Sequence, residues 1–257
     1  MEQTIAHVLR CEDIARDIFL LVLVAPGIAR EARPGQFVHI AVPGADGHIL
    51  RRPISLMGFD AAAGTLTMAI QVKGEGTRRL RGLRPGDGAD VLGPIGRGFE
   101  LRGAGRAFFV GGGVGVAPVR GALNVFQREC ACEAFFGYRS EAFAYGLEGL
   151  GCPAHIVTDD GTLGERALVT APLLRAIAAG APDVIFACGP TPMLRAVQKI
   201  ALEQNIPCQL SLEERMGCGL GACLVCNCKV HAADGFDYKR VCVDGPVFDA
   251  REVLFDD

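Results

Sequence analysis

Hydrophobic residues in the first hundred positions fall in short runs rich in β-branched side chains, and turns rich in glycine and proline separate these runs. The runs that we assign to strands are residues 5–9, 18–24, 36–42, 65–73 and 89–92. Short strands with turn residues at regular intervals are typical of a small antiparallel barrel or sandwich. We therefore expect an antiparallel β-barrel domain over residues 1–101.

The pattern changes after a linker at residues 102–106. Apolar strand candidates now occur together with segments in which hydrophobic residues recur at helical spacing. The strands are residues 107–110, 132–138, 155–158, 184–188 and 208–210, and the helices are residues 117–127, 173–179 and 193–204. Such alternation predicts an α/β domain with a doubly wound parallel sheet. We place this domain at residues 102–210 and assign residues 211–257 to a third module.

The composition of the 257 residues, with 50% hydrophobic side chains and a net charge of −3, is that of a well-packed protein. This charge gives no reason to expect nucleic acid or a membrane surface as a partner. The longest apolar run is residues 18–25, whereas a membrane span takes about 20 residues, and the first residues lack the pattern of a signal peptide. Eleven cysteines in such a chain point to the reducing cytoplasm and to metal or cluster ligation.

Four cysteines near the C-terminus follow the spacing C-x4-C-x2-C, with the fourth further along the chain. They are Cys218, Cys223, Cys226 and Cys242. This is the plant-type ligand pattern of a [2Fe–2S] cluster, and three interleaved glycines would let the backbone wrap the cluster. A structural zinc site is the alternative, although such sites usually have two short cysteine knuckles and this chain has one. Cys228 is a further thiol nearby, and we interpret it as part of a strand that leaves the cluster.

Residues 111–118 read GGGVGVAP and lie between the first strand and the first helix of the α/β domain. Glycines there allow a tight turn and the close approach of a pyrophosphate to the helix N-terminus. Pro118 stands where the third glycine of G-x-G-x-x-G would be, so a simple packing turn is the alternative. Residues 188–190 read CGP and follow another apolar strand, at the edge of the sheet where ligands of open α/β sheets bind. A turn that ends the strand without binding a ligand explains this second motif equally well.

Two weaker motifs lie in the barrel. Residues 51–55 read RRPIS, where an arginine could clamp a phosphate and a serine could hydrogen-bond a ring nitrogen. Residues 74–77 read GEGT and could form a second phosphate-binding turn. Taken alone, the first motif is more commonly a solvated arginine pair, and the second is more commonly an ordinary surface turn.

These motifs occur in an order that resembles the ferredoxin-reductase superfamily, and most closely the electron-transfer subunits of class 1B dihydroorotate dehydrogenases, over essentially the whole chain. The resemblance implies an FAD-binding barrel, an NAD(H)-binding α/β domain and a [2Fe–2S] module. The implied FAD contacts are Arg52, Pro53, Ile54, Ser55, Ile70, Gln71, Gly76 and Thr77. The implied nicotinamide-nucleotide contacts are Gly112, Gly113, Gly115, Cys188, Gly189 and Pro190. The implied cluster ligands are the four cysteines named above.

The same resemblance implies a function. The chain would relay electrons from an FMN-containing partner subunit that oxidises dihydroorotate, through the cluster and FAD, to NAD+ in pyrimidine biosynthesis. The complex would be a heterotetramer with two copies of each chain. The alternatives are the small subunit of an NADH-dependent ferredoxin:NADP oxidoreductase or of a sulfide dehydrogenase type complex, and a non-enzymatic zinc or redox-sensing module.

Two residues differ from the wider superfamily. Many of its reductases carry an aromatic residue before the serine of the barrel motif, where this chain has Ile54. The related ferredoxin:NADP oxidoreductase subunits commonly have aspartate as the first cluster ligand, where this chain has Cys218, which favours the dihydroorotate interpretation. The choice between NAD and NADP stays open, because Arg139 could meet a 2′-phosphate and Glu141 could bond a ribose hydroxyl.

Overall fold

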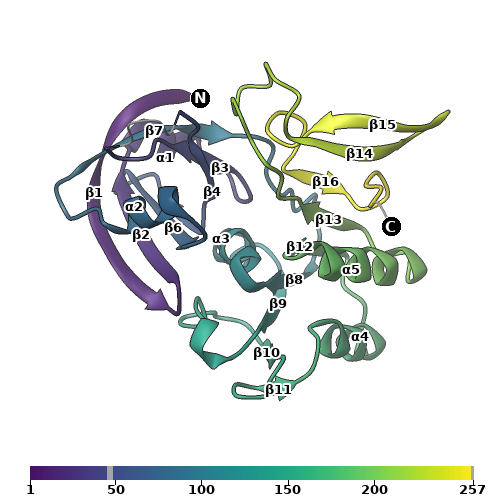
Figure 1. Cartoon of the computed structure of the whole chain (residues 1–257). Coiled ribbons are helices and arrows are strands. Elements are labelled where there is room, and N and C mark those ends of the chain that lie inside the picture. Colours follow the sequence, from purple (N-terminus) through teal and green to yellow (C-terminus); the bar gives the residue numbers. More distant parts are fainter. Residues whose placement is uncertain (45–48, 256–257) are drawn as a thin grey trace.

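The computed structural model describes residues 1–44 and 49–255, which form two large sheets and a small hairpin (Figure 1). The strands of the first sheet are β1 (Glu2–Ala15), β2 (Ile18–Val24), β3 (Phe37–Ile40), β4 (Arg52–Ser55), β5 (Gly58–Asp60), β6 (Thr65–Gln71) and β7 (Gly88–Ile95). Their order is β4-β3-β7-β1-β2-β6-β5, and every neighbouring pair is antiparallel. Helices α1 (Pro26–Glu31) and α2 (Glu75–Arg81) lie in the connections. The sheet curls on itself, and the predicted antiparallel barrel is confirmed.

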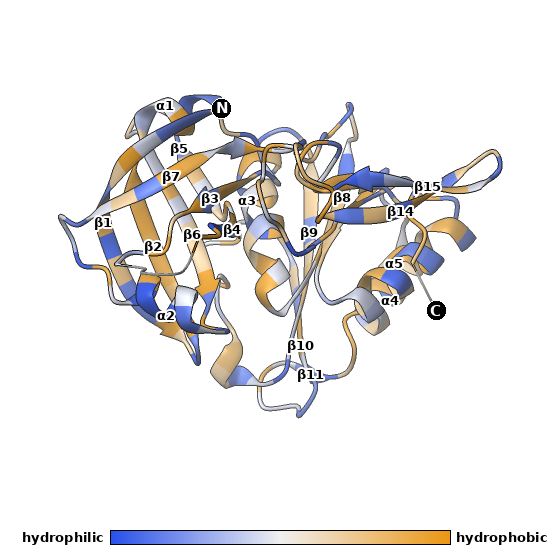
Figure 2. Cartoon of the chain, turned by 45° about the horizontal axis from the view of Figure 1, so that its top comes forward, coloured by the Kyte–Doolittle hydropathy of each residue, from blue (hydrophilic) through white to orange (hydrophobic). Residues whose placement is uncertain are grey.

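Every second side chain along the barrel strands points into the interior of the barrel. In β2, Phe19, Leu21 and Leu23 are fully buried, and Met68 of β6 enters the same core. Burying each such side chain stabilises the fold by roughly 1.5–3 kcal/mol. Ile18 instead packs in a core that belongs largely to the second sheet. In Figure 2, β2 is coloured mostly hydrophobic and α2 mostly hydrophilic, because α2 lies on the outside.

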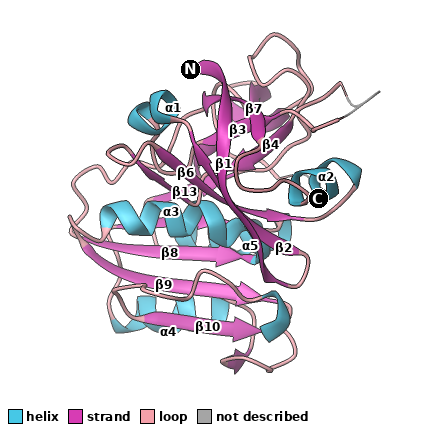
Figure 3. Cartoon of the chain, turned by 90° about the vertical axis from the view of Figure 1, so that its left-hand side faces the viewer, coloured by secondary structure: helices cyan, strands magenta, loops and turns pink. Residues whose placement is uncertain are grey.

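The second sheet contains the strands β8 (Arg106–Gly112), β9 (Ala131–Tyr138), β10 (Ala154–Thr158), β11 (Glu165–Arg166), β12 (Val184–Cys188), β13 (Cys208–Ser211) and β16 (Val247–Asp249). Their order is β11-β10-β9-β8-β12-β13-β16, and all pairs are parallel except β13 with β16. Figure 3 shows β8, β9 and β10 side by side and pointing the same way. The chain winds outward from β8 in one direction and then returns to β12. A switch point therefore lies between β8 and β12, which is where open α/β sheets bind ligands.

Helices cover both faces of this sheet. They are α3 (Val116–Phe126), α4 (Thr170–Ala179) and α5 (Thr191–Glu203), and the single turns η1 (Gly113–Gly115) and η2 (Glu141–Phe143) are 3-10 helices. Phe109 packs in the core that contains α3, whereas its neighbour Phe108 packs in the core that contains α4 and α5. Successive strand residues point to opposite faces, so the sheet is doubly wound, as predicted. None of the helices in the described part of the chain is long and apolar enough to cross a membrane.

The last segment returns to the second sheet. After β13, an irregular loop leads to the hairpin of β14 (Asn227–Ala232) and β15 (Gly235–Arg240), and β16 then pairs with β13. The backbone N–H of Arg97, after the last barrel strand, donates to the carbonyl of Gly245. The segment between β15 and β16 is therefore bonded to the barrel just before β16 joins the α/β sheet.

Candidate functional site

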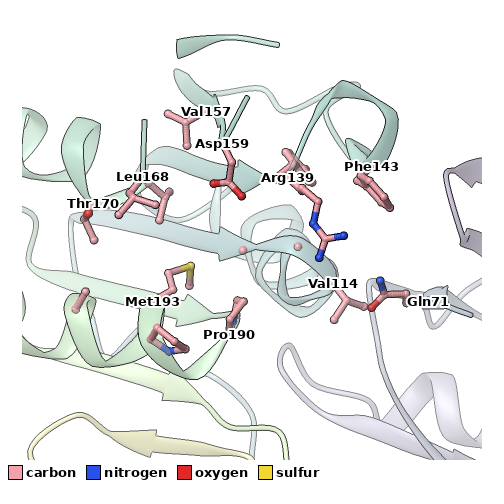
Figure 4. Close-up of a pocket in the computed structure, with 18 of the residues that line it drawn as sticks. Gln71, Val114, Arg139, Phe143, Val157, Asp159, Leu168, Thr170, Pro190 and Met193 are labelled. Carbon is pink, nitrogen blue, oxygen red and sulfur yellow. The ribbon is translucent and has the colours of Figure 1, made fainter. Parts of the chain in front are cut away.

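A cavity of about 560 Å³ opens at the switch point of the second sheet (Figure 4). Its walls come from the turns that follow β8, β9, β10 and β12, from residues 167–170 at the start of α4, and from Ile18, Gln71 and Lys73 on the side of the barrel. The predicted residues that line it are Gln71, Gly112, Gly113, Gly189 and Pro190. This volume lies in the range of small-molecule and cofactor sites.

Glycines bring the two central turns together. A Cβ atom at Gly115 would lie 2.4 Å from the carbonyl oxygen of Cys188, and one at Gly112 would lie 2.5 Å from the Sδ atom of Met193. Gly113 has φ +54°, a conformation that suits glycine, and a Cβ there would meet no atom within 4 Å. Gly115 and Cys188 thus lie beneath the cavity rather than in its wall, and Gly113 faces open space. Burial raises the pKa of the Cys188 thiol above its ordinary value.

A second cavity of about 190 Å³ lies between the barrel and α3. The predicted residues in its wall are Pro53, Ile54, Ser55, Ile70, Gln71 and Thr77. Glu214 and Met216, from the loop that leads to the cysteines, line it as well. Both cavities share the side chains of Gln71, Lys73, Val114 and Glu213, so the two spaces adjoin.

Arg52 and Gly76 lie beside this second cavity without lining it. A Cβ atom at Gly76 would lie 2.5 Å from Nε of Arg52, so the guanidinium rests against the glycine backbone. The same guanidinium donates a hydrogen bond of 2.6 Å to the carbonyl of Leu50. Next in the chain, the Thr77 hydroxyl accepts the backbone N–H of Gly74 at 3.2 Å and fixes the turn before α2. A positive charge and a fixed turn therefore meet at this end of the cavity.

Three of the charged side chains that line the cavities follow strands of the second sheet; Arg139 was considered from the sequence, whereas Asp159 and Glu213 were not. Arg139 and Asp159 follow β9 and β10, and Figure 4 shows both pointing into the larger cavity. Glu213 follows β13 and lines both cavities. All three stand just beyond the C-terminal end of a predicted strand, a position that marks the ligand edge of a parallel sheet. Glu141, the alternative partner of a ribose hydroxyl, is not in the wall; its backbone N–H donates to Thr162 at 2.9 Å.

The four predicted ligands, three in the loop before β14 and Cys242 after β15, form two pairs. In the first, the Sγ atoms of Cys218 and Cys223 are 3.3 Å apart. The backbone N–H groups of Leu220 and Cys223 donate to Cys218 Sγ at 3.3 and 3.4 Å. These hydrogen bonds, from Cys223 first and Leu220 second, lower the pKa of the Cys218 thiol to about 6. Positive φ angles at Gly219 and Gly221 let the backbone turn its amides toward the sulfur.

The second pair, Cys226 and Cys242, is buried. Burial, followed by the hydrogen bond with Cys226, raises the pKa of Cys242 to about 12. Coordination to a metal deprotonates a thiol outright, so ligation would remove this proton. Cys228, in contrast, lies on β14 and its thiol faces the carbonyl of Lys239 at 3.5 Å. It belongs to the hairpin.

The paired arrangement fits a [2Fe–2S] cluster, in which each iron takes two of the four thiolates. A structural zinc site would instead gather four ligands around one ion. Backbone N–H groups directed at a ligand sulfur are also a feature of iron–sulfur sites. The donor set is thus suited to the cluster rather than to zinc.

Comparisons with known proteins agree with this geometry. Residues 213–254 match a family model described as the iron-sulfur cluster binding domain of dihydroorotate dehydrogenase B. A "Dihydroorotate dehydrogenase B (NAD(+)), electron transfer subunit" from Caldanaerobacter subterraneus is 41% identical over 253 residues, which cover 97% of this chain and 98% of the relative. A protein of the same description from Geobacillus kaustophilus is 41% identical over 248 residues and 94% of each chain. A solved structure of an NADH-dependent reduced ferredoxin-NADP oxidoreductase has 28% identity and a TM-score of 0.86, over 98% of this chain and 90% of its own.

Proposed function

Because this chain belongs to the family of dihydroorotate dehydrogenase B electron transfer subunits, we propose that it carries electrons from a dihydroorotate-oxidising partner to NAD+ in pyrimidine biosynthesis. When bound, the [2Fe–2S] cluster supplies one-electron transfer, and FAD supplies the step from single electrons to a hydride. The partner would be an FMN-containing catalytic subunit, in a heterotetramer with two copies of each chain. Relatives at 41% identity favour this function over that of the ferredoxin-NADP oxidoreductase, which is 28% identical.

The observation that carries the proposal is the contiguity of three binding places. The cysteine loop contributes Glu214 and Met216 to the smaller cavity. The smaller cavity in turn shares the side chains of Gln71 and Val114 with the larger one. A flavin held by the barrel would therefore have the cluster loop on one side and the nicotinamide site on the other. Such a row suits electron relay, because each carrier adjoins the next.

The side chains of the smaller cavity suit a flavin nucleotide. We assign Ser55 to a hydrogen bond with the flavin ring and Ile54 to aliphatic packing against it, since both line the cavity. Arg52, held beside Gly76, would offset phosphate charge at the turn before α2. Burial of Ile54 and of the neighbouring Ile70 keeps water away from the ring.

The larger cavity suits NAD. Gly112 and Gly113 open the turn before α3, where backbone N–H groups favour a pyrophosphate. Asp159 places a carboxylate in the same cavity, and a carboxylate accepts a hydrogen bond from a ribose hydroxyl but repels a 2′-phosphate. The carboxylate of Asp159 therefore favours NAD over NADP. Arg139 places a positive charge in the same cavity. None of the eleven cysteines forms a disulfide, which suits the reducing cytoplasm that we propose for the complex.

The test is a reconstitution with the catalytic subunit. The chain purified with its partner should reduce NAD+ when dihydroorotate is added, and neither chain alone should do so. The chain alone should still oxidise NADH with an artificial acceptor. Native mass spectrometry then gives the stoichiometry. Orotate formation by this chain alone would contradict the proposal, because it would require a substrate site that the relay function does not include.

A further prediction concerns how the partner docks. The loop between the first three ligands exposes the apolar side chains of Leu220, Leu224 and Val225, which are 52%, 69% and 56% exposed. A partner that covers them brings its own carrier next to the cluster. Leu224→Glu should weaken the complex about tenfold or more, since burying a leucine contributes roughly 1.5–3 kcal/mol and each 1.4 kcal/mol is tenfold. Titration calorimetry of the two subunits measures this.

The control is Leu202→Glu, at another exposed leucine, which lies on α5 away from the cysteine loop. It should leave the affinity unchanged, and both variants should keep the visible spectrum of the cluster. Equal weakening by the two substitutions would place the partner elsewhere.

A further inference from the structure

Strand β3 has two faces with different neighbours. Val38 and Ile40 point into the barrel core. Phe37 points the other way and packs in the same core as Cys226 and Cys242. His39 alternates with Val38 and Ile40, so it also faces away from the barrel interior, toward the cysteine loop. β3 pairs with β7 on one side and on the other with β4, whose Pro53, Ile54 and Ser55 line the smaller cavity.

His39 is a buried polar side chain that the protein itself does not satisfy. The ring is fully buried, and neither Nδ1 nor Nε2 has a hydrogen-bond partner among the described residues. Buried polar groups in native proteins are nearly always hydrogen-bonded, and an exception calls for a ligand or another explanation. A neutral imidazole offers one N–H donor and one acceptor. Burial, and then the charge of Arg51, lower the pKa of His39 to about 4, which agrees with a neutral ring.

The ring lies against the loop that carries the first cysteine pair. A Cβ atom at Gly219 would lie 2.5 Å from Cε1 and 2.6 Å from Nδ1 of His39. Gly219 follows Cys218 directly and has φ +68°, so both its backbone and the imidazole require a glycine here. On the same loop, the N–H groups of Leu220 and Cys223 already donate to the sulfur of Cys218. Among the described residues, the buried imidazole without a hydrogen-bond partner thus lies against the backbone of the loop that carries the predicted cluster ligands.

We propose that the imidazole N–H of His39 donates a hydrogen bond to a sulfur atom of the [2Fe–2S] cluster. The inference rests on the cluster assignment of the proposed function and adds a residue of the barrel to the surroundings of the cluster. A hydrogen bond to a cluster sulfur stabilises the more negative, reduced state and raises the reduction potential. A residue of the barrel, His39, would therefore raise the reduction potential of the cluster.

Pulsed electron paramagnetic resonance of the reduced heteromeric complex tests the contact directly. The protein is labelled with 15N-histidine and compared with His39→Phe and His39→Gln in the same labelling. We expect a weak coupling between the electron spin and a histidine nitrogen in the unsubstituted protein, and its loss in both variants. The exposed His7 serves as the control, since His7→Gln should leave the coupling unchanged.

A redox titration of the same samples tests the energetic consequence. His39→Phe keeps a planar ring but removes the donor, so reduction of the cluster should become about tenfold less favourable, a shift of 59 mV to a more negative potential. His39→Gln keeps an N–H donor and should retain most of the original potential. The potential of the FAD should change in neither variant.

The outcomes separate this inference from the function on which it rests. Absence of a [2Fe–2S] signal in the unsubstituted complex would overturn both. A normal cluster signal without histidine coupling, or with a coupling that survives in His39→Phe, would overturn the role of His39 alone. An unchanged potential in His39→Phe would do the same. If His39→Phe does not fold, His39→Gln still decides, because the labelled coupling must disappear there while the potential stays.

Discussion

Replacing Cys223 by serine should remove the iron–sulfur cluster while leaving FAD bound. Cys223 pairs with Cys218 at 3.3 Å and also directs its backbone N–H at that sulfur, so the substitution removes one ligand from the more exposed pair. A serine hydroxyl is a hard, weakly acidic donor and a poor substitute for a thiolate on iron. Dihydroorotate-dependent reduction of NAD+ by the complex should fall by about a hundredfold or more, because every electron must cross the cluster.

The flavin site provides the internal reference for this experiment. The smaller cavity is built by the barrel, α3 and the segment before the cysteines, and Cys223 does not line it. The variant should therefore keep its FAD and still oxidise NADH with an artificial acceptor. Visible absorption, acid-labile sulfide and flavin content measure these quantities on one sample. Retention of both the cluster and coupled turnover would show that the ligand assignment is wrong.

Cys228→Ser is the matched control. This thiol lies only two residues after Cys226, yet it faces the carbonyl of Lys239 in the β14–β15 hairpin. A serine hydroxyl can make the same contact. The cluster spectrum and the turnover should both be unchanged.

Most of the fold could be predicted because the hydrophobic pattern of each strand or helix lies within a short stretch of sequence. The apolar run of β2 and the helical spacing of hydrophobic residues in α3 and α5 can be recognised within each element. Short or partly polar strands such as β5 and β11 carry too few residues to form a pattern. The pairing of β16 with β13 depends on a contact between residues about forty positions apart, which no local pattern records. The irregular loop between them could be recognised only by its cysteine spacing.

The candidate site was predictable where chemistry depends on spacing along the chain. The four cysteines and the glycine turn at Gly112 and Gly113 are of this kind, and their assignment as ligands and contacts stays a prediction. Glu213, Asp159 and His39 carry no such signal, because none of them belongs to a motif with a recognisable spacing. Their significance comes from tertiary contacts. His39 in particular occurs in an apolar strand, where a histidine is ordinarily a packed core residue.

Gly115→Ala should weaken the binding of NADH and destabilise the α/β domain together. Gly115 has φ −65°, which alanine adopts without strain, so the whole effect comes from the new methyl group. That group would lie 2.4 Å from the carbonyl oxygen of Cys188 and 2.6 Å from the backbone nitrogen of Gly189. Neither atom belongs to a flexible side chain, so the turns after β8 and β12 must move apart. Overpacking of this kind costs about 1–3 kcal/mol.

The same movement would widen the larger cavity, which both turns line and which we propose binds NAD. The KM for NADH should therefore rise about tenfold or more, since each 1.4 kcal/mol lost from binding is a factor of ten. FAD and the cluster should be retained. Gly105→Ala is the control, because a Cβ there meets only a side-chain oxygen of Asp183 at 3.5 Å. Steady-state NADH oxidation with an artificial acceptor, together with thermal unfolding, separates the two effects. A loss of stability with an unchanged KM would mean that Gly115 serves the packing of the sheet and that the nucleotide does not depend on how closely the two turns approach.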